Sequence, residues 1–351
     1  MSGILIIPPE HIKHKKRNRV STNVWPREGI RVEQLNRSRL LIYIALFALV
    51  VAVFVGIVRG RQSSPEKAGE EFKYQEPTIT LYDHKTGEKK KIRFEDYIAG
   101  VVAAEMAPTW PREALAAQAI IARTFTLHKI KYEGGVPQHG ADASTDTEEF
   151  QAYDPGRIND NVRAAVEMTR GKVIRYNGKY VRAWFHANAG GKTATPAEGL
   201  GFTKEPTPYI KSVADPGQEI APPEERNWAA SFPVGGVRKA VSRETGQDPG
   251  EFTSAAIVER GPSGRATKIR LGSTVVSGPA LRLALGTEAM RSTLLDRLEV
   301  RDGALVVSGR GHGHGVGMSQ WGAYYFAREG KSPEEIIKYY YSGVTVDKIW
   351  R

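Results

Sequence analysis

The chain has 351 residues, a length typical of about two or three domains, and its composition of 40% apolar and 25% charged residues excludes a disordered or fibrous protein. It has no cysteine, which excludes disulfides, thiolate metal sites and a cysteine nucleophile. The net charge of +11 is uneven, because residues 1–61 carry +8 and the rest of the chain only +3. This nearly neutral remainder argues against nucleic acid as a partner.

The first predicted element is a transmembrane helix over residues 40–58. These 19 residues carry no charge, and as a helix they would span about 28 Å, close to the thickness of the hydrocarbon core. A buried core helix is the alternative, but core helices rarely contain so few polar residues. Nine basic residues lie in the arm 1–39, so we expect this arm in the cytoplasm and everything after residue 60 outside. The length of the apolar stretch disfavours a cleaved signal peptide.

Residues 59–77 are polar and bounded by proline, which is typical of a linker, so we expect an ordered exterior region over 78–351. Within it, short extended runs flank turn residues at four places, which predicts four β-hairpins. Their strands are expected at 79–82 with 89–93, at 173–176 with 180–185 around Asn177-Gly178, and on either side of 261–264 and of 302–303.

Three helices are predicted from apolar periodicity and capping residues. They are expected over 94–106, from Pro111 onward, and after Ser332, where proline and Glu335 complete an N-terminal capping pattern. Helices and hairpins do not alternate regularly along the chain. The pattern therefore predicts the α+β class rather than a parallel α/β sheet.

Glu105 has an unusual place in the helix predicted over 94–106. Phe94, Ile98 and Val101 form its apolar face, and Glu105 falls next on that face. A carboxyl group there lies either at the wet rim of the core or in a cleft, where loss of hydration would raise its pKa as a general acid requires. The spacing alone favours the rim.

The sequence of residues 311–320, GHGHGVGMSQ, is the most unusual in the chain. Its four alternating glycines allow either close approach to a ligand or special backbone dihedral angles. His312 and His314 could supply two metal ligands, but a metal site needs three or four, and no cysteine or nearby carboxylate completes one. The alternative is a glycine-rich loop that caps a helix beginning near Ser319.

Several strings, in order, resemble the stage II sporulation protein D family over about residues 78–346. They are AAEM at 103–106, EALAAQA and ARTF within 113–125, FHANAGGKT at 185–193, Ser263-Gly264-Arg265, and GHGVGMSQWGA at 313–323. The resemblance implies an α+β fold in two lobes with the substrate cleft between them. It also implies a lytic transglycosylase that cuts peptidoglycan glycan strands already stripped of stem peptides, during engulfment of the forespore in sporulation.

The resemblance also implies the site residues. The family's catalytic glutamate corresponds to Glu105. Candidates for lining the substrate cleft are His186, His314, Ser319 and Gln320, although either histidine could simply hold a loop by hydrogen bonds.

Some relatives carry a Cys/His zinc site after the second helix, but residues 142–153 here contain neither residue, so we expect no metal and no cofactor. The implied partners are glycan strands, an amidase/endopeptidase and a multispanning membrane protein, with the chain anchored once in the cell membrane. A non-catalytic wall-binding scaffold or amidase enhancer stays open as the alternative. An enzyme, unlike a scaffold, requires a carboxyl group at the position of Glu105.

Overall fold

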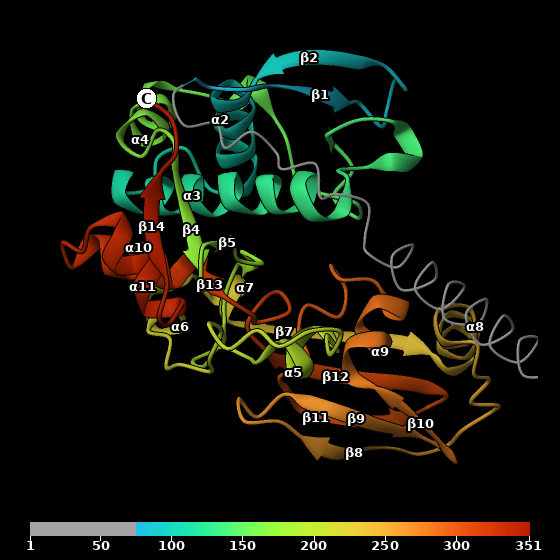
Figure 1. Cartoon of the computed structure of the whole chain (residues 1–351). Coiled ribbons are helices and arrows are strands. Elements are labelled where there is room, and N and C mark those ends of the chain that lie inside the picture. The colour runs from blue at the N-terminus through green and yellow to red at the C-terminus, as the bar shows by residue number, and fades with distance from the viewer. Residues whose placement is uncertain (1–74) are drawn as a thin grey trace, which may run out of the picture. The chain divides into compact units, whose positions relative to one another are not determined.

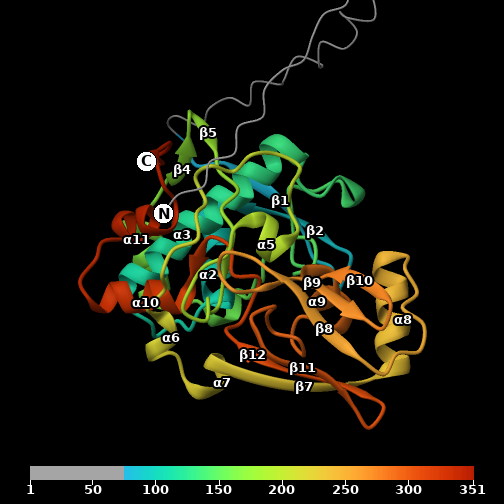
Figure 2. The same ribbon diagram turned by 90° about the horizontal axis from the view of Figure 1, so that it is seen from below.

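The computed structural model describes residues 75–351 (Figures 1 and 2). The predicted arm 1–39 and membrane segment 40–58, with most of the linker 59–77, lie outside the described residues. Within residues 75–351, the helices are all too short or too polar to cross a membrane. The described chain mixes helices with five small sheets, which confirms the α+β class.

The first hydrophobic core is mainly helical. Its helices are α2 (Phe94–Glu105), α3 (Arg112–His128), α4 (Asp160–Met168), α10 (Gln320–Arg328) and α11 (Pro333–Tyr340), with shorter turns at Lys129–Glu133, Pro137–His139 and Pro155–Arg157. Two sheets pack with them, in the strand orders β2-β1-β3 and β14-β4-β5. The strands are β1 (Thr78–Tyr82), β2 (Lys89–Arg93), β3 (Ala143–Ser144), β4 (Lys172–Tyr176), β5 (Lys179–Tyr180) and β14 (Thr345–Lys348).

The second hydrophobic core is mainly strands and is drawn from residues 228–307. Its two sheets have the orders β11-β12-β7 and β10-β9-β8. The elements are β7 (Asn227–Pro233), α8 (Val234–Thr245), β8 (Ala255–Arg260), β9 (Ala266–Leu271), β10 (Thr274–Ser277), α9 (Gly278–Leu285), β11 (Leu295–Arg301) and β12 (Ala304–Arg310). The buried residues of the first core come from before residue 211 and after residue 315. The segment that forms the second core is therefore inserted, in sequence, between the two parts of the first. The expected cleft between two lobes stays a prediction.

Short elements connect the two cores. They are β6 (Phe185–His186), α5 (Pro196–Leu200), α6 (Gly217–Ile220), α7 (Pro223–Arg226) and β13 (Met318–Ser319). The buried carboxylate of Glu198 in α5 accepts hydrogen bonds from the backbone N–H of Ser263 (2.9 Å) and of Arg265 (3.2 Å). The fully buried guanidinium of Arg265 in turn donates to the carbonyl oxygens of Ala189 (2.7 Å) and Lys192 (2.9 Å). These bonds fix the 189–198 segment to the β8–β9 turn.

The predicted hairpins are confirmed at β1–β2, β8–β9 and β11–β12, and in part at β4–β5. Asn177 (φ 50°) and Gly178 (φ 76°) adopt the left-handed conformation that a tight hairpin turn requires. The strand predicted over 180–185 is wrong, because β5 ends at Tyr180. The N–H of Val181 still donates to the carbonyl of Ile174 in β4 at 3.3 Å, but the N–H of Arg182 donates to the distant Tyr209 hydroxyl at 3.0 Å.

The three predicted helices are confirmed with small changes at their ends. The helix α2 ends at Glu105, because Met106 is extended (φ −132°, ψ 155°). Pro111 is the N-cap of α3 rather than a residue of its first turn. Ser332 and Glu335 form the predicted capping box of α11, in which each side chain bonds to the other's backbone N–H.

Candidate active site

Glu105 is the last residue of α2, and its side chain is half-buried. The helix forms there because Phe94, Ile98 and Val101 are fully buried on one face, which leads to residue 105 a turn later. The carboxylate oxygen Oε1 accepts a hydrogen bond from the backbone N–H of Ala152 at 2.9 Å. The carboxyl group is therefore oriented by a main-chain donor that cannot itself titrate.

Burial raises the pKa of Glu105 to about 7, while the Ala152 N–H and the Gln320 side chain act in the opposite direction. Gln320 is buried, and its Nε2 makes no hydrogen bond of standard length and angle within the described structure. The Gln320 amide is thus close enough to Glu105 to influence it and still has a free donor. With a pKa near 7, Glu105 can both donate and accept a proton at neutral pH.

The structure brings His186, Ser319 and Gln320 together. The strands β6 and β13 run parallel, and His186 lies opposite Ser319 in their register. Gln320 follows directly as the first residue of α10, and its side chain acts on Glu105. The segments that contain His186 and Ser319, more than 130 residues apart in sequence, therefore meet next to Gln320, which acts on the last residue of α2. The order of the motifs along the chain does not reveal this contact.

The two candidate histidines bracket one residue of the glycine-rich loop. The Nδ1–H of His186 donates to the carbonyl of Val316 (3.2 Å), and Nδ1 of His314 accepts from the Val316 N–H (3.0 Å). The two rings lie 5.8 Å apart between centroids. Burial, with the neighbouring arginine side chains, lowers the pKa of His314 to about 3 and that of His186 well below its usual value. Both rings are neutral at pH 7, and their contacts hold the loop.

The four glycines of the loop are needed for backbone shape and for close packing against protein. All four have φ between +74° and +105°. A Cβ on Gly313 would lie 2.7 Å from the Cβ of His186, and one on Gly315 would lie 2.4 Å from the Arg265 guanidinium. The sequence left open whether these glycines allow special dihedral angles or close approach to a ligand. The structure contains the special dihedral angles, and the atoms that approach the glycines closely belong to the protein itself.

Ser319 has a structural contact of its own. Its hydroxyl oxygen accepts from the N–H of Gly322 at 3.1 Å and so caps α10. The Ser319 hydroxyl also acts to lower the pKa of a nearby buried carboxyl group, that of Asp215, whose Oδ1 accepts from the Tyr340 hydroxyl at 2.6 Å. Burial raises the pKa of Asp215. Ser319 therefore fixes the start of the helix that carries Gln320, and no sequence motif pointed to Asp215.

His312 and His314 do not converge on one point. The Nδ1 of His312 lies 2.9 Å from the Glu225 carboxylate, with which it forms an ion pair when protonated. Across residues 75–351, histidine and carboxylate side chains nowhere gather in a group of three that could hold a metal ion. The expectation of no metal stays a prediction.

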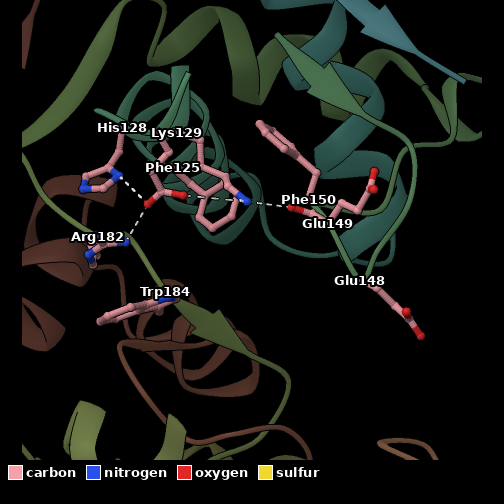
Figure 3. Close-up of a pocket in the computed structure, with 9 residues that line it drawn as sticks. Phe125, His128, Lys129, Glu148, Glu149, Phe150, Arg182 and Trp184 are labelled. Atoms are coloured by element: carbon pink, nitrogen blue, oxygen red, sulfur yellow. Dashed lines mark hydrogen bonds and ion pairs between the residues drawn. The ribbon is translucent and has the colours of Figure 1, made fainter. Parts of the chain in front are cut away.

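A separate pocket of about 200 Å³ lies at the end of α3 (Figure 3), and Glu105 is not among the residues that line it. Lys129 donates to the carbonyl of Glu149 at 2.6 Å, and Arg182 pairs with Glu133 at 2.7 Å. Figure 3 shows His128 and Arg182 directed toward the same carboxylate. Burial lowers the pKa of His128 to about 4. Because the cations bond within the protein, we assign no ligand to this pocket.

Sequence reasoning missed two features of the site. The donor from Ala152 leaves no trace in the sequence, because every residue except proline carries a backbone N–H. The neighbourhood of Glu105 and Gln320 was also hidden, since more than 200 residues separate them. Fold and site together define an α+β protein with a carboxyl group placed for proton transfer near neutral pH.

Comparisons with known proteins give the family. The family model described as stage II sporulation protein matches residues 82–176. Stage II sporulation protein D of Bacillus subtilis is 32% identical over 303 residues, which are 80% of this chain and 82% of that protein. The protein of the same name from Bacillus amyloliquefaciens is 30% identical and covers 77% and 79%. The amidase enhancer of Bacillus subtilis is 28% identical, over 71% of this chain and 40% of that protein. The chain belongs to the stage II sporulation protein D family.

Proposed function

We propose that the chain is a lytic transglycosylase that cleaves the glycan strands of peptidoglycan after their stem peptides have been removed. The observation that carries this proposal is Glu105, a half-buried carboxyl group with a pKa of about 7 at the end of α2. Membership of the sporulation family supports it. Ordinary glycosidases use two carboxylates, whereas a lytic reaction needs one group that first donates a proton and then accepts one.

In the proposed reaction, protonated Glu105 gives its proton to the oxygen of the bond between muramic acid and glucosamine, and the C1–O bond breaks. The C6 hydroxyl of the same muramic acid then forms a bond to C1. Its proton passes to the Glu105 carboxylate, which restores the acid. The products are a free glucosamine hydroxyl and a 1,6-anhydro end, and no water is consumed.

Two neighbours of Glu105 support this chemistry. The Ala152 N–H binds the carboxylate oxygen Oε1 and so fixes the orientation of the carboxyl group. The unbonded Nε2 of Gln320 can donate to a sugar oxygen and so help to orient the ring. His186, His314 and Ser319 keep the supporting loop and helix in place and are positioning residues in this proposal.

The cellular setting is proposed with the activity. We place the chain in the cell membrane through residues 40–58, with its amino terminus in the cytoplasm and the catalytic region outside, acting in forespore engulfment. An amidase/endopeptidase would supply stripped strands, and a multispanning membrane protein would hold the complex. Protease added to intact protoplasts should digest the region after residue 75 and spare the arm 1–39.

The second candidate function is a scaffold that enhances an amidase without cutting glycan. The similarity to the amidase enhancer of Bacillus subtilis favours it. Purified full-length chain in detergent, incubated with peptide-free glycan strands, separates the two. Mass spectrometry should detect 1,6-anhydro ends. Intact strands, together with faster peptide release by an added amidase, would support the scaffold, and reducing ends made by addition of water would contradict the lytic reaction.

A further inference from the structure

Three aromatic side chains gather beside the candidate active site. The ring of Trp110 lies 4.5 Å from that of Trp321 and 5.0 Å from that of Tyr324, and the last two are 5.4 Å apart between centroids. Trp110 belongs to the turn between α2 and α3, and the other two belong to α10. All three side chains are partly exposed. We call these three residues the aromatic cluster.

The two rings of α10 lie on the side of the helix that faces away from the core. Ala323, Phe326 and Ala327 are buried on the opposite side. At 100° per residue, Trp321 and Tyr324 share the outer side with the exposed Arg328. Packing into the first core therefore does not explain why these two positions are large and aromatic. Partly exposed apolar surface of this kind, with polar groups at its edge, is typical of a binding site.

Hydrogen bonds hold both halves of the aromatic cluster in place. The side-chain N–H of Asn161 donates to the carbonyls of Pro108 (3.0 Å) and Trp110 (2.9 Å) and so fixes the turn. The backbone N–H of Trp321 donates to the carbonyl of Ala187 at 3.0 Å, and Ser319 caps its helix. A surface fixed before binding loses little conformational entropy when a ligand arrives.

The aromatic cluster is continuous with the site at Glu105. Trp110 follows Glu105 by five residues, through a turn in which the N–H of Trp110 donates to the carbonyl of Ala107 at 2.9 Å. Trp321 directly follows Gln320, whose side chain acts on Glu105. Both halves of the aromatic cluster therefore lie within a few residues of a group at the site, which places the cluster next to a ligand bound at Glu105.

The chemistry of the aromatic cluster suits a saccharide. One face of a pyranose ring carries C–H groups that are apolar and slightly positive, and an aromatic face is negative, so the two attract in addition to burying apolar area. Around the rings lie donors that suit hydroxyl and acetamido oxygens. Arg328 donates to the Tyr324 hydroxyl at 3.4 Å, and Arg112 donates to Asn161 at 3.3 Å. Each of these bonds uses one of the several N–H groups that a guanidinium carries, so further N–H groups are present for a sugar oxygen.

We propose that Trp110, Trp321 and Tyr324 form a stacking platform for a sugar ring of the same glycan strand that Glu105 cleaves, next to the scissile bond. This inference rests on the proposed function, and it identifies the residues that would position the glycan strand relative to Glu105. Binding at the platform would place the bond to be cut beside Glu105 and add affinity without taking part in proton transfer.

The test uses full-length chain in detergent carrying Glu105→Gln, so that the ligand is bound and not cut, with chitohexaose, a hexamer of N-acetylglucosamine, as the probe in calorimetric titration. Trp321→Leu keeps an apolar side chain but removes the aromatic face, so Kd should rise about tenfold. Trp321→Phe keeps the face and should stay within about threefold of the parent. If the cluster only sealed the helix, leucine and phenylalanine would give the same Kd.

The matched control is Tyr325→Leu, which removes a ring from the same helix that packs on Phe326 (5.6 Å) and not on the cluster. It should leave Kd unchanged, with melting temperatures recorded for every variant. An unchanged Kd for Trp321→Leu, or no binding of chitohexaose by the Glu105→Gln parent, overturns the platform.

The failure of the platform and the failure of the proposed function give different results. If the wild-type chain cleaves stripped strands while Trp321→Leu alters neither Kd nor KM, the platform is wrong and the enzyme stands. If the wild-type chain cuts no strand but binds chitohexaose through Trp321, the platform stands and the lytic activity is wrong.

Discussion

Two glutamates of the helix α2 have the same side chain but different roles. Glu95, in the first turn, is 5% exposed, and its two oxygens accept four hydrogen bonds. The donors are Arg123 Nε (3.0 Å), Arg123 Nη2 (2.7 Å), the Gly171 N–H (3.0 Å) and Trp350 Nε1 (2.8 Å). This carboxylate joins α2 to α3, to the start of β4 and to the carboxy-terminal end of the chain.

Glu105, at the other end of the same helix, has far fewer partners. Among residues 75–351 it has one backbone donor, from Ala152, and a neighbouring amide, Gln320, with no arginine or lysine paired to it. The comparison teaches that burial alone does not indicate function. A buried carboxylate whose oxygens accept a full set of hydrogen bonds holds elements of the fold together. A carboxylate with few hydrogen-bond donors around it can exchange a proton.

The largest effect is expected at Glu105. Glu105→Gln keeps the shape but cannot transfer a proton, so release of 1,6-anhydro ends should fall by about 10²–10⁴-fold. Mass spectrometry of the products measures it, and a melting curve at pH 5 shows whether the fold is retained. A folded Glu105→Gln chain that cleaves stripped strands at the wild-type rate would show that Glu105 is not the acid.

The second prediction concerns the replacement of Glu95. Glu95→Gln leaves the guanidinium of Arg123 buried without its anion, which should lower the free energy of unfolding by about 3–5 kcal/mol. Thermal unfolding followed by circular dichroism measures this loss. Activity per folded molecule should change little. A large loss of activity in a chain of normal stability would mean that the two glutamates do not differ as the structure indicates.

The third prediction concerns pH. Between pH 4.5 and about 7 the folded chain keeps a proton on Glu105 that the unfolded chain has released, so this group makes the wild type less stable as pH rises through that range. Glu105→Gln lacks this dependence. Its melting temperature should match the wild type at pH 4 and exceed it at pH 8, by an amount equivalent to at most about 3 kcal/mol. An equal difference at both pH values would contradict the raised pKa.

The smallest effect is expected at Gln320. Its amide lowers the pKa of Glu105, so Gln320→Leu should move the alkaline limb of the activity profile to higher pH by up to about one unit, with a rate loss of about tenfold or less. Gln138→Leu is the matched control, because Gln138 donates to a different glutamate, Glu149, at 3.0 Å. If the alkaline limb of the activity profile lies at the same pH in Gln320→Leu as in the wild type, Gln320 does not act on Glu105.

Local signals were reliable wherever a few neighbouring residues decide the conformation. Asn177-Gly178 predicted its tight turn, and Ser332 with Glu335 predicted the start of α11, because both depend on contacts within four residues. The strand predicted over 180–185 failed for the opposite reason. From Arg182 to Phe185 its residues bond or pair with residues far along the chain, such as Tyr209 and Met318, and no local pattern carries that information.

The sequence by itself determined that Glu105 lies near the end of an amphipathic helix, on its apolar face, that the chain is α+β, and which family it resembles. It left open whether the carboxyl group meets water or a cleft, since periodicity fixes the face and not the neighbours. Only the tertiary structure brought Ala152 and Gln320 to Glu105, brought Trp110 to Trp321, and gave the carboxyl group of Glu105 a pKa of about 7. Burial and hydrogen bonding depend on segments that meet only when the chain folds, and these set the chemistry.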